Sequence, residues 1–280
     1  MEYETQQMFA DQFRRMHRGP KILVLPNAWD VASACIFQTA GFKAIATTSA
    51  GIANSLGYRD GQLISRREMI EVVQRIAGAV SVPVTADMEA GYAESQEGVF
   101  DTANELIGSG AIGLNFEDAT GNPAAPLYES EIQIKRIRAI CEAGRSAGIP
   151  LVINARTDSF WKGPGDEAAR LQEAIRRGNA YLEAGADCVF VPGAIQRHII
   201  ETLCKDISGP VNILAIKGVP SISELAGMGV SRVSVGSGIM RGAMGLAKRA
   251  ALELLERGTY DSFTEGAVTY DDMNGLVTRQ

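Results

Sequence analysis

Carboxylate side chains follow two neighbouring apolar runs of this sequence. Asp87 and Glu89 stand at the end of VPVTADM (82–88), and Glu117 stands at the end of GLNFED (113–118). Residues two apart on a strand point to the same side, so we expect Asp87 and Glu89 to share a face. Three crowded carboxylates repel one another unless a cation lies among them. Oxygen ligands of this kind suit Mg²⁺, or alternatively Mn²⁺. The pattern predicts a metal site formed by Asp87, Glu89 and Glu117.

An arginine and a small polar segment are candidate anion-binding groups. Arg156 stands at the end of LVINART (151–157), and its planar guanidinium matches a carboxylate or phosphonate. The alternative is that Arg156 forms a structural ion pair with a nearby carboxylate such as Glu117. The segment TTSAG (47–51), which contains Thr48, Ser49 and Ala50, offers hydroxyls and lets a ligand approach the backbone.

These residues end segments that alternate with helical patterns along the chain. Several of the segments are continuously apolar, as strands buried on both faces should be. Helical spacing runs through 67–80, 131–148 and 166–187. Eight such strands with intervening helices predict a (β/α)8 TIM barrel. An open doubly wound sheet is the alternative, but no GxGxxG follows the first strand. The eight strands are expected at 21–27, 44–50, 82–88, 113–118, 151–157, 188–193, 211–216 and 232–237.

No linker divides the chain, so we expect one barrel domain over 1–280. Its core would span about 20–240, preceded by an N-terminal helix and followed by a C-terminal helical tail over 241–280. A barrel places its active site at the carboxyl ends of the strands, where the predicted site residues would converge.

The predicted mouth of the barrel, at the carboxyl ends of the strands, contains neither histidine nor cysteine. His17 and His198 fall in helices, and Cys188 begins a strand at the opposite end of the barrel. We therefore do not expect a catalytic triad or proton transfer by an imidazole, because both require a histidine at the active site. Two weaker hypotheses remain: a phosphate site at SVGSGIMRG (234–242) and a Schiff base at Lys217.

Composition excludes several other classes of protein. The net charge of −6, the 46% apolar residues and the 21% charged residues are typical of a soluble globular protein, not a disordered one. No basic stripe suggests nucleic-acid binding, and no run of about 18 apolar residues suggests a membrane span. Four scattered cysteines and two histidines argue against disulfides and zinc. We expect a reduced, cytoplasmic protein.

Four motifs together resemble the isocitrate lyase/phosphoenolpyruvate mutase superfamily. They are AIATTSAGIANSLGYRDG, TADMEAGY, GLNFED and NARTD, in that order within roughly 20–240. The sequence is most similar to the branch described as phosphoenolpyruvate-mutase-like or carboxyvinyl-carboxyphosphonate-phosphorylmutase-like. Such enzymes cleave or form a C–C or P–C bond beside a 2-oxo acid through a Mg²⁺-bound enolate.

The resemblance implies roles for individual residues. Thr48, Ser49 and Ala50 would hold the carboxylate and oxo group of the substrate, with Arg156 as the substrate-binding arginine. Asp60 would lie beside the metal site as a catalytic residue. The metal ligands would be Asp87, counted also as catalytic, with Glu89 and Glu117. The resemblance further implies a homotetramer, a dimer of dimers, in which the C-terminal helix packs on a neighbouring subunit.

Three departures from the family bear on the reaction. Lyases of the family carry a Lys-x-Cys-Gly-His type loop, but ATGNPAAPLYESE (119–131) has no cysteine, histidine or lysine. Mutases place a lysine and an asparagine there, and only Asn122 is present. The glutamate that lyases have on strand 6 is replaced by Gly193.

The leading hypothesis is a Mg²⁺-dependent lyase that cleaves a C–C bond beside a small 2-oxo acid, by decarboxylation of an oxaloacetate-like acid or by retro-aldol cleavage. Alternatives are a mutase or hydrolase of the phosphonopyruvate type, a non-catalytic protein that binds a 2-oxo acid, and an aldolase using Lys217. The short loop over 119–127 contains proline, glycine and alanine and is a candidate lid, a role that the sequence alone leaves open.

Overall fold

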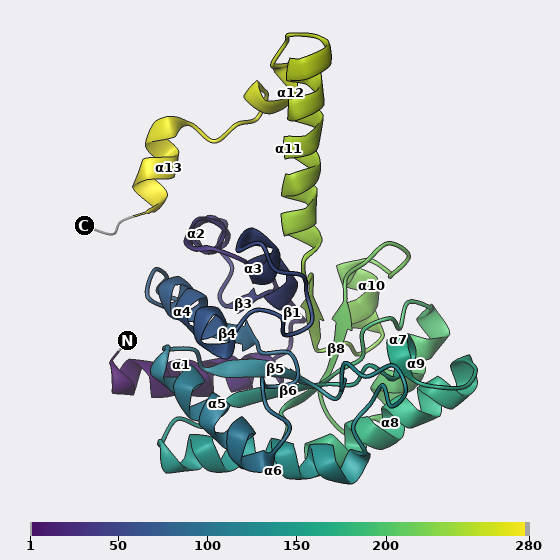
Figure 1. Ribbon diagram of the computed structural model, residues 1–280. Helices are drawn as coiled ribbons and strands as arrows, with labels where there is room; N and C mark the ends of the chain where they lie inside the picture. Colours follow the sequence, from purple (N-terminus) through teal and green to yellow (C-terminus); the bar gives the residue numbers. More distant parts are fainter. Residues whose placement is uncertain (1, 278–280) are drawn as a thin grey trace.

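Short parallel strands lie side by side around the centre of the computed structural model, which describes residues 2–277 (Figure 1). Nine strands occur in this part of the chain, in the spatial order β1-β9-β8-β7-β6-β5-β4-β3-β2. All eight expected strands are present. Their bounds are β1 Leu23–Leu25, β2 Asn27–Ala28, β3 Ile45–Thr47, β4 Val84–Asp87, β5 Gly113–Glu117, β6 Val152–Arg156, β7 Cys188–Phe190, β8 Val211–Leu214 and β9 Arg232–Ser234.

The first expected strand is divided at a proline, and this division closes the barrel. Pro26 separates β1, which pairs with β9, from β2, which pairs with β3. Proline has no N–H to donate, so the ladder breaks there, while its carbonyl still accepts a hydrogen bond from Ala46. The ring is therefore completed by the chain itself, and the TIM-barrel prediction is confirmed.

Helices surround the strands, and the expected helical segments are found as α4, α6 and α8. Capping boxes at Ser65 and Ser221 begin two of the helices, as expected for serine followed by glutamate three residues later. The bounds are α1 Tyr3–Met16, α2 Val31–Thr39, α3 Ser49–Ser55, α4 Arg66–Ala77, α5 Gln96–Gly108, α6 Ser130–Ser146, α7 Ser159–Lys162, α8 Glu167–Glu183, α9 Arg197–Asp206, α10 Ile222–Gly227, α11 Gly238–Glu256, α12 Asp261–Thr264 and α13 Tyr270–Leu276.

The N-terminal helix α1 covers the end of the barrel opposite the mouth. Gln6 donates to the carbonyls of Ile107 and Ala111, and Arg14 pairs with Asp187 at 2.7 Å. These partners lie at or just before the starts of strands or at a helix end, so α1 seals the amino-terminal side. Arg14, which is partly buried, also donates to two carbonyls just before β6 and so leaves few groups unsatisfied there.

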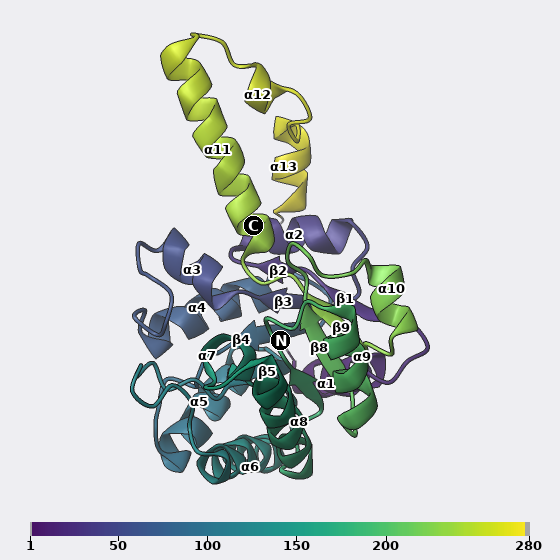
Figure 2. The same cartoon turned by 90° about the vertical axis from the view of Figure 1, so that its right-hand side faces the viewer.

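The C-terminal helices α11, α12 and α13 form an arm that projects from the barrel (Figures 1 and 2). The arm returns to the barrel at α13, which contacts α2, and Leu276 packs against the cluster that contains Phe37. Among the described residues, no helix has the length and apolarity that crossing a membrane requires.

His17, just past the end of α1, is a buried neutral histidine. Burial, and then the positive charge of Arg232, lower its pKa to about 3. The ring satisfies both neighbours when neutral, because Nδ1–H donates to the Phe13 carbonyl at 2.9 Å and Nε2 accepts from Arg232. Protonation would remove the second hydrogen bond and place two cations together.

We predict that His17 makes the protein less stable as the pH falls below 6.5. The unfolded chain takes up a proton at this residue near pH 6.5, whereas the folded chain does not until about pH 3. Unfolding is therefore favoured by about 2 kcal/mol at pH 5 relative to pH 7. Chemical denaturation at both pH values should show this loss in the wild type, and His17→Gln should lack it. His198→Gln, at an exposed position, is the control and should keep it.

Candidate active site

A pocket of about 120 Å³ opens at the carboxyl ends of the strands. The structure brings six of the predicted site residues to its wall. Two predicted metal ligands, Glu89 and Glu117, do not line it. The six are Thr48, Ser49, Ala50, Asp60, Asp87 and Arg156.

Asp87 is fixed by β3 and by the start of α3. Its Oδ2 accepts hydrogen bonds from the Ser49 N–H at 3.1 Å and from Ser49 Oγ at 2.8 Å. Its own N–H donates to Thr47 Oγ1. The other carboxylate oxygen, Oδ1, is buried and has no hydrogen-bond partner. A buried ionised oxygen without a partner is costly, so Asp87 is suited to bind a cation or a donor that enters the pocket.

Arg156 at the end of β6 lies between two buried acids. Its Nη1 pairs with Glu117 at 2.8 Å, and its Nε and Nη2 donate to the two oxygens of Asp158 at 2.6 and 3.0 Å. Burial alone would lower the pKa of Arg156, but these carboxylates raise it well above its ordinary value. The ion pair considered from the sequence is therefore present. Three of the five N–H groups are occupied, which leaves two for a ligand.

Two aromatic rings cover the guanidinium of Arg156. It lies 5.1 Å from the ring centre of Trp161 and 6.0 Å from that of Phe190, both of which line the pocket. A cation over an aromatic face is stabilised, and the rings keep water from it. Neither residue follows a sequence pattern that predicts a position in the mouth, so neither was predicted.

Glu89 does not share a strand with Asp87, so the expectation that alternation aligns them is wrong. The strand β4 ends at Asp87, and Glu89 adopts a positive φ of 49° in the turn that follows. Its Oε1 accepts a hydrogen bond from the Tyr92 hydroxyl at 3.1 Å. The tight turn to Gly91 takes this segment out of the extended conformation that the alternation requires.

Negative charge nevertheless accumulates around the mouth. Burial and then the charge of Asp87 raise the pKa of Asp60. Burial, Asp87 and Asp60 together raise the pKa of Glu89 to about 7. Burial also raises the pKa of Glu117, although Arg156 opposes this shift. Neighbouring carboxylates disfavour one another's ionisation, so a cation bound among them would be stabilised. Among the described residues, however, no three Asp, Glu, His or Cys side chains converge tightly enough to form a metal cluster.

Asp118, one residue after Glu117, belongs to the supporting structure. It is fully buried; its Oδ2 accepts from Arg177 at 3.1 Å and from the Tyr181 hydroxyl at 2.8 Å. Its Oδ1 accepts from the N–H of Asp158 at 2.9 Å. Because Asp158 binds Arg156, this network connects α8 to the orientation of Arg156.

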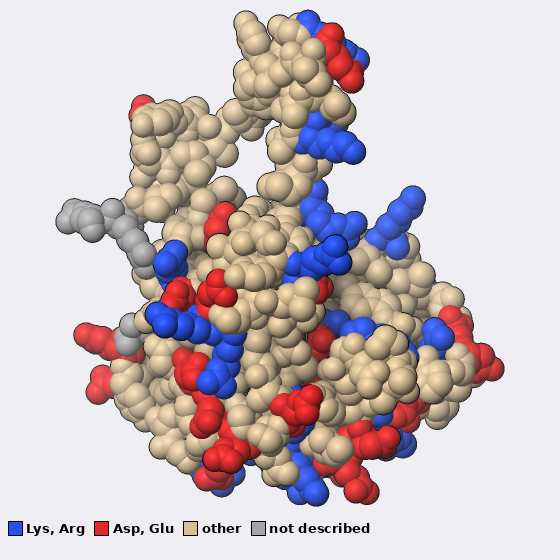
Figure 3. Space-filling model, viewed as in Figure 1, with Lys and Arg blue, Asp and Glu red and all other residues tan. Residues whose placement is uncertain are grey.

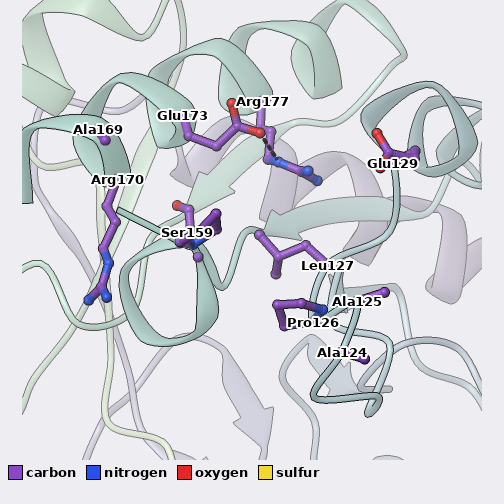
Figure 4. A pocket seen from close by; sticks show the side chains of 12 residues that line it. Ala124, Ala125, Pro126, Leu127, Glu129, Ser159, Ala169, Arg170, Glu173 and Arg177 are labelled. Carbon is purple, nitrogen blue, oxygen red and sulfur yellow. Dashed lines mark hydrogen bonds and ion pairs between the residues drawn. The ribbon is translucent and has the colours of Figure 1, made fainter. Parts of the chain in front are cut away.

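The larger cavity, of about 530 Å³, lies outside the mouth. Figure 4 shows that Arg170, Glu173 and Arg177 line one side of it and Ala124 to Leu127 the other. The segment at Ala124 belongs to the candidate lid loop, whose ends meet in a bridge between Ala119 and Leu127. We place the chemistry in the smaller pocket, because the partnerless Asp87 oxygen is there.

The residues of the two remaining sequence hypotheses differ in their position relative to the pocket. Gly236 and Ser237, from the segment proposed to bind phosphate, line it. Lys217 is exposed in a turn and does not line it, so the Schiff-base hypothesis gains no support. Asn115 also lines the pocket and was not predicted as a site residue, although it lies two residues before Glu117 on the same strand and therefore points to the same side.

The sequence matches a family model over most of its length. The model describes phosphoenolpyruvate phosphomutase, and residues 13–255 fit it. The chain belongs to the phosphoenolpyruvate phosphomutase family. Family membership agrees with the resemblance of the four motifs, which cover the residues that the structure gathers at the mouth.

Individual relatives match more than two thirds of the chain. The chain is 34% identical over 226 residues to an uncharacterized protein of Mycobacterium tuberculosis (strain ATCC 25618 / H37Rv), which covers 80% of this chain and 81% of that protein. It is 31% identical to the 2-methylisocitrate lyase of Bacillus subtilis (strain 168) over 208 residues, 69% of this chain and 62% of that enzyme.

Solved structures agree in shape. A protein of Burkholderia cenocepacia J2315, provisionally described as a lyase/mutase, superposes with a TM-score of 0.91 at 36% identity, covering 97% of this chain and 96% of that one. A 2,3-dimethylmalate lyase superposes with a TM-score of 0.83 at 26% identity, covering 95% and 93%. The protein is an enzyme of the isocitrate lyase/phosphoenolpyruvate mutase superfamily, whose members are lyases and mutases.

We predict that Asp118→Ala destabilises the protein by about 3 kcal/mol, because Arg177 would keep its buried charge without this partner. Chemical denaturation would measure the loss. Asp101→Ala, which removes an exposed carboxylate on α5, is the matched control and should change the free energy of unfolding by less than about 0.5 kcal/mol. An equal, small change in both variants would contradict a supporting role for Asp118.

Proposed function

We propose that this family member is a lyase that depends on a divalent metal ion and cleaves a C–C bond beside a small 2-oxo acid. The observation that carries the proposal is the buried Oδ1 of Asp87, which has no partner inside a pocket that Arg156 also lines. A cation-binding oxygen beside an anion-binding guanidinium suits a substrate that carries a carboxylate next to a carbonyl.

The residues present fit Mg²⁺, or alternatively Mn²⁺. Asp87 would bind the ion directly. Glu89 and Glu117 would interact with it from nearby, through water molecules bound to the ion. Polarisation of the 2-oxo group by a Lewis acid is the chemistry that such an ion would supply. Because both ions prefer oxygen ligands and retain waters, a site with one direct carboxylate is adequate.

The residues of the chain perform the other tasks. Ser49 holds Asp87 in place through two hydrogen bonds, so its free oxygen needs no reorganisation when a ligand arrives. Arg156, oriented by Glu117 and Asp158, would bind the substrate carboxylate through its two remaining N–H groups. Trp161 and Phe190 would exclude water from that contact.

The size of the pocket and the composition of the loop 119–131 limit the reactions that the site could catalyse. A volume of about 120 Å³ admits a small acid, and no side chain of the loop 119–131 can deliver a proton as a cysteine, histidine or lysine would. Decarboxylation of an oxaloacetate-like acid and retro-aldol cleavage both meet these limits. P–C cleavage of a phosphonopyruvate-like acid is the second candidate, favoured by Gly236 and Ser237 in the pocket wall.

We also propose that the enzyme is a cytoplasmic homotetramer assembled through the C-terminal arm. Only Met240 of the 19 residues of α11 is buried, although the helix carries several large apolar side chains. Leu255 is 82% exposed and Leu254 is 51% exposed. In Figure 3 the charged side chains of the arm lie mainly along one edge of α11 and at its tip. Exposed apolar side chains gathered on a projecting helix are typical of a subunit interface. The four cysteines are free, which supports a reducing compartment.

We predict that EDTA and Asp87→Ala each abolish turnover. Pyruvate released from oxaloacetate, and phosphate released from phosphonopyruvate, should be measured with Mg²⁺ and with EDTA. Loss of the carboxylate should lower kcat/KM on the order of 10³-fold, while Asp101→Ala keeps it unchanged. Circular dichroism must show that Asp87→Ala is folded. Full activity of the folded variant, or activity that EDTA does not reduce, would sink the proposed metal site.

We predict that Leu255→Asp together with Leu252→Asp dissociates the tetramer, because buried charges in an apolar interface are costly. Light scattering after size-exclusion chromatography would show the smaller mass. Glu256→Gln on the same helix is the control and should leave the mass unchanged. A monomeric wild type would reject the proposed assembly without touching the proposed reaction.

A further inference from the structure

Arg232, at the start of β9, is a cation buried inside the barrel. It is fully buried, and all three of its side-chain hydrogen-bond partners are neutral. Nη2 donates to Asn115 Oδ1 at 3.2 Å, Nε donates to Ser234 Oγ at 3.3 Å, and Nη1 contacts His17 Nε2 at 3.4 Å. Within residues 2–277, no carboxylate forms an ion pair with it. Because β9 and β5 are not neighbouring strands, the contact with Asn115 crosses the barrel interior.

A buried charge without a counter-ion is unfavourable, and proteins normally pair or neutralise such a group. Burial lowers the pKa of Arg232 and the nearby Cys188 and Asp87 oppose this shift, so that the pKa is about 10 and the guanidinium is still charged at neutral pH. The barrel therefore retains a positive charge that its own hydrogen bonds do not neutralise. Packing does not require an arginine here, since an apolar side chain of similar volume would also fill the space.

Two of the partners of Arg232 connect it to the pocket. Asn115 and Ser234 both line the pocket, and Asn115 stands opposite Asp87 in the register of β4 and β5. The guanidinium is thus one hydrogen bond below the pocket floor. At this depth solvent does not screen its charge, so the charge acts on whatever occupies the pocket.

We propose that Arg232 is a positioning residue whose fixed charge, acting beneath Asn115 and Ser234, makes the pocket selective for a small dianionic substrate. This inference rests on the proposed function, because it assumes that a metal ion and an anion share the pocket. The charge attracts the anion and repels the cation. It therefore favours the substrate while it weakens binding of the metal alone, an opposition that a purely structural arginine would not produce.

The experiment compares three substitutions at one position. Arg232→Met removes the charge and keeps the volume, Arg232→Gln removes the charge and keeps donors for Asn115 and Ser234, and Arg232→Lys keeps the charge. Calorimetry would measure the affinity of the metal-free protein for Mn²⁺, and the affinity of the Mn²⁺-saturated protein for oxalate. Oxalate is a planar dianion that resembles the enolate of a 2-oxo acid. Arg138→Met, at an exposed position, is the control.

We expect Arg232→Met and Arg232→Gln to bind oxalate about tenfold more weakly and Mn²⁺ several-fold more tightly. Arg232→Lys should stay near the wild type in both. Weaker binding of both ligands in the neutral variants, or wild-type binding in Arg232→Gln with loss in Arg232→Lys, would overturn the proposal. So would failure of both neutral variants to fold, because the residue would then serve stability. A wild type that binds neither ligand would instead contradict the proposed function itself.

Discussion

The mouth depends on one buried interaction, the clamp of Arg156 between Glu117 and Asp158. A single carboxylate buried at this depth would be too costly to keep ionised, and a single guanidinium would be equally unfavourable. The three groups stabilise one another, and Lys162 adds a fourth charge at 2.8 Å from Asp158. These ion pairs leave two N–H groups of Arg156 free. They also join the ends of β5 and β6, where Glu117 and Arg156 are paired in the register. The pocket wall takes its shape from that arrangement.

The clamp is in turn supported from outside the barrel. Asp118 accepts hydrogen bonds from Arg177 and Tyr181 of α8 and from the N–H of Asp158. The outer helix α8 therefore holds the segment after β6 that contains Asp158. The orientation of the anion-binding group therefore depends on side chains that never meet the substrate. Active sites of barrels lie at strand ends, and here two pairs of residues form that region. Glu117 and Arg156 end β5 and β6 and pair with each other, while Asp118 and Asp158, just beyond these strands, hold Arg156 in place.

Sequence periodicity predicted the barrel well because buried parallel strands are continuously apolar, and glycine marks the helix ends. It also placed Asp87 and Arg156 at the mouth, since both end such strands. It failed at Glu89, because the strand stops two residues earlier and a positive φ redirects the side chain. It could not find Trp161 or Arg232 as parts of the site. Trp161 reaches the pocket from a helix of four residues, and Arg232 reaches Asn115 across the barrel, so only three-dimensional contacts reveal either.

One departure from the lyases of this superfamily, Gly193, contacts the aromatic cover of Arg156. Gly193 stands where those lyases are expected to carry a glutamate, and a Cβ at this position would lie 2.7 Å from the ring of Trp161. Any side chain there would displace the tryptophan, which in turn covers Arg156. The absence of a side chain at Gly193 therefore leaves space for Trp161 over the guanidinium of Arg156. Gly193 brings no carboxylate that could transfer a proton at this edge of the mouth, while Trp161 limits the access of water to Arg156. This arrangement favours reactions in which stabilising negative charge on a small acid is the main difficulty.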